Sequence, residues 1–238
     1  MSVATLFFAT LVHATLGFGT ALVAMPILVL ILPNSVATPL VGFVMLVTAC
    51  FILVRDRHDM DWRAAGGLVV ASLFGTPVGL WLLLFAPPGQ LKILVGLLLV
   101  GYAAWQLARP QLPTLRDRHL KPLACAIAGF TAGALGVACN INGPPVVLYG
   151  ALCRWPPDRF RATLQAFFLP AALIVVGVQG SAGLWTAPVF DLFFVALPVV
   201  LLANLLGRLI ASRIPLEAFT RLLYWVLIVL GMSLIFLG

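Results

Sequence analysis

The stretch GALGVACNINGPPVVLYGAL, residues 133–152, interrupts an apolar segment with glycines, two asparagines and a Pro-Pro pair. Inside a membrane, backbone N–H and C=O groups that leave a helix lose their partners at a cost of several kcal/mol each. They are tolerated only where protein or a water-filled cavity satisfies them. If this chain lies in a membrane, the interruption therefore marks a site.

Composition places the chain in a membrane. Of its 238 residues 63% are hydrophobic and 9% are charged, against about 25% charged residues in soluble domains. A helix needs about 20 mostly apolar residues to cross a bilayer. Six segments meet this requirement: 36–54, 64–85, 91–108, 162–179, 189–211 and 219–237. We therefore expect an all-α integral membrane protein.

Two further apolar segments, 3–32 and 123–153, are each broken near the middle by glycine and polar residues. A shift of 119 residues places Leu16-Gly17 on Leu135-Gly136 and Pro26 on Pro145. The chain is therefore predicted to be a duplication. The two halves are residues 1–110 and 122–238, each a broken segment plus three spans, joined by a loop at 111–121.

The distribution of lysines and arginines distinguishes two ways in which the broken segments could lie in the membrane. If each crossed once, the 14 basic residues would divide seven to seven, which gives the positive-inside rule nothing to distinguish. If residues 123–153 turn back at mid-depth, thirteen lie on one side and only Lys92 on the other. The return arm, residues 144–153, is also too short to span. We predict a re-entrant pair of half-helices, inverted halves, and cytoplasmic basic loops in a bacterial-type inner membrane.

The breaks indicate an anion site. A half-helix begins after each break. Pro144 or Pro145 in the second half, and Pro26 in the first, is expected near its first turn, where proline suits the helix. Free N–H groups and the positive end of the dipole favour an anion there. Neutral side chains at the breaks add donors. The predicted substrate-binding residues are Gly17, Phe18, Gly19, Thr20, Cys139, Asn140, Asn142, Gly143, Pro144 and Gln165.

Several of these residues have simpler interpretations. Asn140 and Asn142 could only cap a half-helix, and Cys139 could be inert packing. Gln165 could face the cavity or only join two helices. His13, one turn before the first break, could relay protons or be a hydrogen-bonded structural histidine.

Other classes of function lack support in the sequence. The basic residues lie in short loops, where insertion topology explains them, so we expect no nucleic-acid partner. The cysteines form no metal-ligand pattern, and acidic residues are almost absent from the spans, so we expect no metal or other cofactor. No constellation of a nucleophile and a base appears, so we expect no enzyme.

The sequences LVHATLGFGTALVAMPIL and GALGVACNINGPPVVLYGAL, with LLGRLIASRIPLEAFTRLLYWVLIVLGMSLIF at the end, resemble the sulfite exporter TauE/SafE family of membrane transporters. The likeness covers nearly the whole chain, and the glycine-rich break followed by proline is its most specific part. The first break lacks the run of glycines common in that family. The resemblance implies secondary transport of a small anion such as sulfite or sulfoacetate.

The predicted function is a carrier in which inverted halves rock around the hairpin tips, with alternating access to a site near the membrane midplane. An anion-selective channel that uses the same helix ends is the alternative. The expected partners are a small anion and the lipid bilayer. A homodimer is left open.

Overall fold

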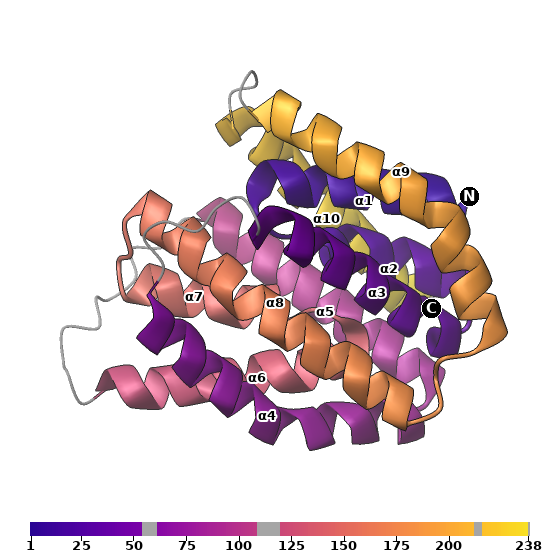
Figure 1. The fold of residues 1–238 in the computed structure, drawn as a ribbon, viewed down its shortest axis with the longest axis horizontal. Coiled ribbons are helices and arrows are strands. Elements are labelled where there is room, and N and C mark those ends of the chain that lie inside the picture. Colours follow the sequence, from indigo (N-terminus) through magenta and orange to yellow (C-terminus); the bar gives the residue numbers. More distant parts are fainter. Residues whose placement is uncertain (54–60, 109–119, 212–215, 238) are drawn as a thin grey trace.

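A computed structural model describes residues 1–53, 61–108, 120–211 and 216–237. Every regular element in these residues is a helix, as predicted, and the ten helices pack into one bundle (Figure 1). They are α1 (Ser2–Leu16), α2 (Thr20–Ile31), α3 (Asn34–Leu53), α4 (Trp62–Phe85), α5 (Pro88–Ala108), α6 (Leu120–Cys139), α7 (Gly143–Leu152), α8 (Pro157–Ser181), α9 (Ala187–Ala211) and α10 (Leu216–Leu237).

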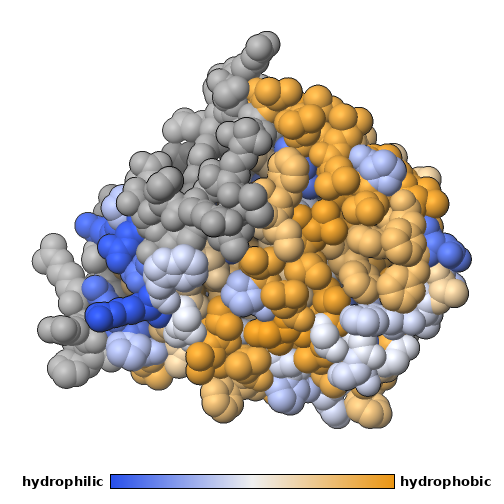
Figure 2. Space-filling view, in the orientation of Figure 1, coloured by the Kyte–Doolittle hydropathy of each residue, from blue (hydrophilic) through white to orange (hydrophobic). Residues whose placement is uncertain are grey.

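Six helices in the described residues are long and apolar enough to cross a membrane. Five of them, α3, α4, α5, α8 and α9, coincide with predicted spans, and the span predicted at 219–237 falls within α10. The sixth is α6, which is longer than the half-helix expected there. Most of the predicted loop 111–121, and residue 54 of the first predicted span, lie outside the described residues. A broad hydrophobic surface covers the bundle, and strongly hydrophilic residues lie at its left and right edges (Figure 2).

Each broken segment folds back on itself. In the first, the Thr20 hydroxyl lies 2.7 Å from Nδ1 of His13, although seven residues of continuous helix would separate them by about 10 Å. In the second, Tyr149 on α7 returns beside Cys125 near the start of α6. The pairs α1–α2 and α6–α7 are therefore helical hairpins. In Figure 1, α6 begins at the left and α7 ends there.

The expected position of one proline is wrong. Pro26 is the seventh residue of α2 and lies inside the helix, because α2 begins directly after Gly19. Pro144 is the second residue of α7 and does lie in its first turn. The alignment of Pro26 with Pro145 therefore joins residues at different depths in their helices.

Helix α6 lies directly against α4 through glycines. A Cβ atom added at Gly75 would lie 1.9 Å from the carbonyl oxygen of Phe130, and one added at Gly133 would lie 2.0 Å from that of Ser72. Small residues allow such backbone approach, and dispersion forces and carbonyl contacts then hold membrane helices together. The second hairpin is thus seated on α4 by close packing of backbone on backbone.

Replacement of Gly75 by Ala should therefore force α4 and α6 apart. Overpacking of this kind costs about 1–3 kcal/mol, so we expect a clear fall in the thermal midpoint of the detergent-purified protein. Gly66→Ala, in the same helix, is the matched control because an added Cβ meets no atom within 4 Å there. Equal midpoints for the two variants would contradict the proposed packing.

An ion pair joins the starts of α4 and α8 at the charged end of the bundle. Asp61 pairs with the Arg159 guanidinium, accepts a hydrogen bond of 3.1 Å from the Ala64 N–H, and donates its own N–H to the Thr163 hydroxyl. Partial burial tends to raise the pKa of Asp61, but these hydrogen bonds and Arg159 outweigh it and hold the pKa below its ordinary value. The carboxylate is therefore favoured in the folded state.

Because the folded-state pKa of Asp61 lies below its ordinary value, its stabilisation is complete above the ordinary carboxyl range. That stabilisation is lost as the pH falls through the folded-state pKa. We therefore expect wild type to exceed Asp61→Asn in thermal midpoint at pH 7, and the gap to narrow toward pH 3. A midpoint series over that range measures it, and a gap independent of pH would refute the assignment.

Candidate functional site

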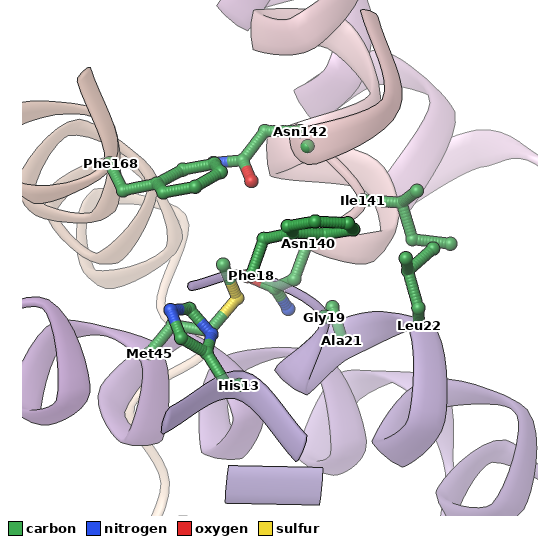
Figure 3. Close-up of a pocket in the computed structure, with 11 residues that line it drawn as sticks. His13, Phe18, Gly19, Ala21, Leu22, Met45, Asn140, Ile141, Asn142 and Phe168 are labelled. Carbon is green, nitrogen blue, oxygen red and sulfur yellow. The ribbon is translucent and has the colours of Figure 1, made fainter. Parts of the chain in front are cut away.

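The two breaks meet in one small cavity. Residues from α1, α2, α3 and α8 surround it together with the second break (Figure 3). Its volume is about 10 Å³, near the lower limit for one water molecule. The lining residues are His13, Phe18, Gly19, Ala21, Leu22, Met45, Asn140, Ile141, Asn142, Gly143 and Phe168.

The predicted site residues divide into three groups around this cavity. Its lining includes Phe18, Gly19, Asn140, Asn142, Gly143 and the predicted relay residue His13. Behind the lining, Gly17, Thr20 and Gln165 make hydrogen bonds that hold the first break. The other two, Cys139 and Pro144, line different cavities.

Sequence reasoning missed five lining residues: Ala21, Leu22, Met45, Ile141 and Phe168. Ala21, Leu22 and Ile141 adjoin the breaks, so their proximity to Gly19 and Asn140 was a usable signal. Met45 and Phe168 lie within apolar helices, where nothing in the sequence distinguishes a cavity-facing residue from a lipid-facing one.

His13 lines the cavity, and its two ring nitrogens differ in their partners. Nδ1 makes hydrogen-bond contacts with two groups of Thr20, the hydroxyl at 2.7 Å and the backbone N–H at 3.5 Å. Since an N–H can only donate, Nδ1 is assigned as the acceptor and Nε2 carries the proton. Nε2 is buried and has no hydrogen-bond partner in the described part of the chain. Its N–H is therefore a donor available to a ligand.

The two asparagines of the second break have different roles. Asn140 has a φ of 59°, a left-handed conformation that asparagine tolerates better than most residues. Its amide donates to the Thr38 carbonyl at 2.7 Å, so this donor is committed to the fold. Asn142 is the N-cap of α7 but makes no capping hydrogen bond, so the capping interpretation is wrong for this residue. Its amide lies at the cavity beside Phe168 (Figure 3).

The first break is held by backbone geometry and by α8. Gly17 and Gly19 have φ values of 85° and 115°, which glycine adopts without a Cβ clash. The Gln165 amide donates to the Gly17 carbonyl at 2.7 Å. Of its two predicted roles, Gln165 therefore takes the structural one, because it satisfies a carbonyl that the break leaves without a helical partner.

Cys139 does not reach this cavity. Its thiol donates to the Leu135 carbonyl at 3.2 Å, one turn back in α6. That contact is typical of a thiol packed within a helix. The described residues contain no group of three or more His, Cys, Asp and Glu side chains that could hold a metal ion.

The bundle, with two helical hairpins that meet at a buried polar cavity, defines a polytopic membrane protein with an internal site. The profile of the sulfite exporter TauE/SafE family matches residues 2–234. The chain belongs to this family. It is accordingly a membrane transporter and not an enzyme, and the predicted resemblance is confirmed.

Two curated relatives are similar over most of their lengths. The probable inner membrane transporter protein TsaS of Comamonas testosteroni is 32% identical over 186 residues, which cover 74% of this chain and 73% of the relative. The probable sulfite/organosulfonate exporter TauE of Cupriavidus necator is 24% identical over 220 residues, 92% of this chain and 86% of the relative. No solved structure matches the chain.

Asn140 gives a test of how the second break is built. Asn140→Gly keeps the left-handed conformation but loses the hydrogen bond to Thr38, which should cost about 1 kcal/mol. Asn140→Ala loses the bond and also strains the backbone, which should cost about 1–2 kcal/mol more. Thermal midpoints in detergent should fall in the order wild type, Gly, Ala. A Gly variant less stable than the Ala variant would contradict the assigned geometry.

Proposed function

We propose that this protein is a secondary transporter of a small, singly charged sulfur anion, bisulfite or an organosulfonate, in a bacterial inner membrane. The anion binds in the cavity between the hairpins. The observation that carries the proposal is the unpartnered Nε2 of His13, which lines the same cavity as the Asn142 amide. The substrate class follows that of the Cupriavidus necator relative, a probable sulfite/organosulfonate exporter.

The lining of the cavity favours one negative charge. Among its residues are neutral donors, His13 and Asn142, but no lysine or arginine. The cost of taking an ion out of water is large and in the Born description grows with the square of its charge. A dianion without a cationic partner would pay about four times the penalty of a monoanion. Neutral donors therefore suit bisulfite or a sulfonate better than sulfate.

The helix packing supports inverted repeats. Suppose that α1–α5 of the first half correspond, in order, to α6–α10 of the second. The contact of α1 with α9 then corresponds to the contact of α6 with α4, and both are observed. The contacts α3–α8 and α5–α10 each pair a helix with its own counterpart. The pair α5–α10 is antiparallel, because Tyr102 meets Tyr224 while Gly96 meets Gly231. Antiparallel counterparts are what a two-fold axis in the membrane plane produces.

The small volume of the cavity supports a carrier over a channel. A volume of about 10 Å³ cannot hold a sulfonate, so binding requires the hairpins to separate. A site that must open for each substrate suits alternating access between the two repeats. The basic loops set the orientation, with the start of α4 and of α8 on the cytoplasmic side.

Two substitutions of His13 separate ligand binding from structure. The amide nitrogen of Gln can lie near the position of Nε2 and donate there, whereas the amide oxygen of Asn can lie near the position of Nδ1 and accept from Thr20. We therefore expect His13→Gln to retain anion binding in part, and His13→Asn to keep the contact with Thr20 but lose binding. Asn142→Leu should also lose binding, because it removes the second donor.

The measurement is the thermal midpoint of the detergent-purified protein with bisulfite, methanesulfonate, sulfate, acetate or chloride. An anion at 100 times its dissociation constant stabilises the folded state by about 2.7 kcal/mol. Methanesulfonate should raise the midpoint of wild type, sulfate should raise it less, and Asn142→Leu should not respond. If no anion shifts wild type, or Asn142→Leu responds as wild type does, the substrate does not bind here.

A further inference from the structure

A second small cavity lies next to the first. It also has a volume of about 10 Å³, and α2, α3, α5 and α6 enclose it. Its lining residues are Met25, Val29, Asn34, Thr38, Leu91, Lys92, Val95, Ala138 and Cys139.

The same faces of two helices line both cavities. On α2, Leu22 borders the first cavity, and Met25, three residues on, borders the second. On α3, Met45 borders the first cavity, and Thr38, seven residues back, borders the second. Such spacings keep side chains on one face of a helix. The cavities therefore follow one line toward the end of the bundle where α3 begins.

A hydrogen bond joins the linings of the two cavities. Asn140 lines the first and Thr38 lines the second, and the Asn140 amide donates to the Thr38 carbonyl across the boundary. Cys139, the next residue, already belongs to the second cavity. Movement of the tip of the second hairpin away from α3 would join the two spaces.

A basic residue and a threonine with an unpartnered hydroxyl are among the residues that line the second cavity. Lys92 is half-buried there, and no described acidic side chain forms an ion pair with it. The Thr38 hydroxyl is buried, at 1% exposure of its residue, and has no hydrogen-bond partner among the described residues. A basic side chain and an unpartnered hydroxyl in the lining of one cavity are groups that a small anion can use.

We propose that the second cavity, around Lys92 and Thr38, is an outer subsite through which the anion reaches or leaves the site between the hairpins. This inference rests on the proposed function. The Lys92 charge raises the local concentration of anions at this face, and its partial exposure keeps their binding weak. Weak binding suits a subsite, because the anion must also leave it.

The test is methanesulfonate counterflow in right-side-out and inverted membrane vesicles, for wild type, Lys92→Gln and Lys92→Arg. On the face that bears Lys92, the Gln variant should raise the half-saturating concentration about fivefold to tenfold and lose most of its dependence on ionic strength. The Arg variant should stay within about twofold of wild type because it keeps the charge. On the opposite face the three proteins should match.

Thr38→Val gives a second variant that should fold. Since its hydroxyl has no partner to lose, the thermal midpoint should not fall, while half-saturation on the Lys92 face should rise. Wild-type half-saturation and salt dependence in Lys92→Gln would overturn the subsite, as would equal effects on both faces. Stabilisation by methanesulfonate in detergent that is present in wild type and lost in Asn142→Leu reports on the inner site, because Asn142 lines that cavity and not the second. Failure of the subsite and failure of the proposed function are therefore distinguishable.

Discussion

Backbone polar groups released at two breaks inside an apolar bundle are the constraint on which the rest of this structure depends. Each broken end must find a partner that water would otherwise supply. Gln165 serves the Gly17 carbonyl, and Asn140 ties the second tip to the Thr38 carbonyl. The helices α8 and α3 are therefore fixed to the hairpins by polar contacts, and this fixes where the two tips meet.

The same constraint decides what remains for a ligand. Most polar groups at the tips are consumed in holding the breaks, as Thr20 is by His13. The donors proposed for the ligand are the Nε2 of His13 and the amide of Asn142. The proposed site, built from these two uncharged donors, is neutral and small. A neutral donor pair favours a weakly hydrated monoanion over a dianion. The basic residue Lys92 stands apart in the adjoining cavity, closer to the end of the bundle.

Much of the fold was predictable because apolar composition and segment length identify membrane-spanning helices. The spans of α3, α4, α5, α8 and α9 followed from apolar runs alone, and both breaks followed from glycine and asparagine within such runs. The site was predicted less well. Asn140, Gln165 and Thr20 were predicted as substrate-binding residues, yet they make hydrogen bonds within the protein. The sequence alone does not show whether a polar side chain at a break will bind the backbone or a ligand.

The sequence by itself determined the class of protein, the positions of the breaks and the residue types available there, since these depend on hydropathy and local backbone preference. Only the tertiary structure decided that the two tips share one cavity, that Met45 and Phe168 complete it, and that Cys139 faces elsewhere. The physical reason is that a helix fixes which residues share a face. The partner that each face meets is chosen by packing between helices far apart in the chain, such as the glycine contacts of α4 with α6.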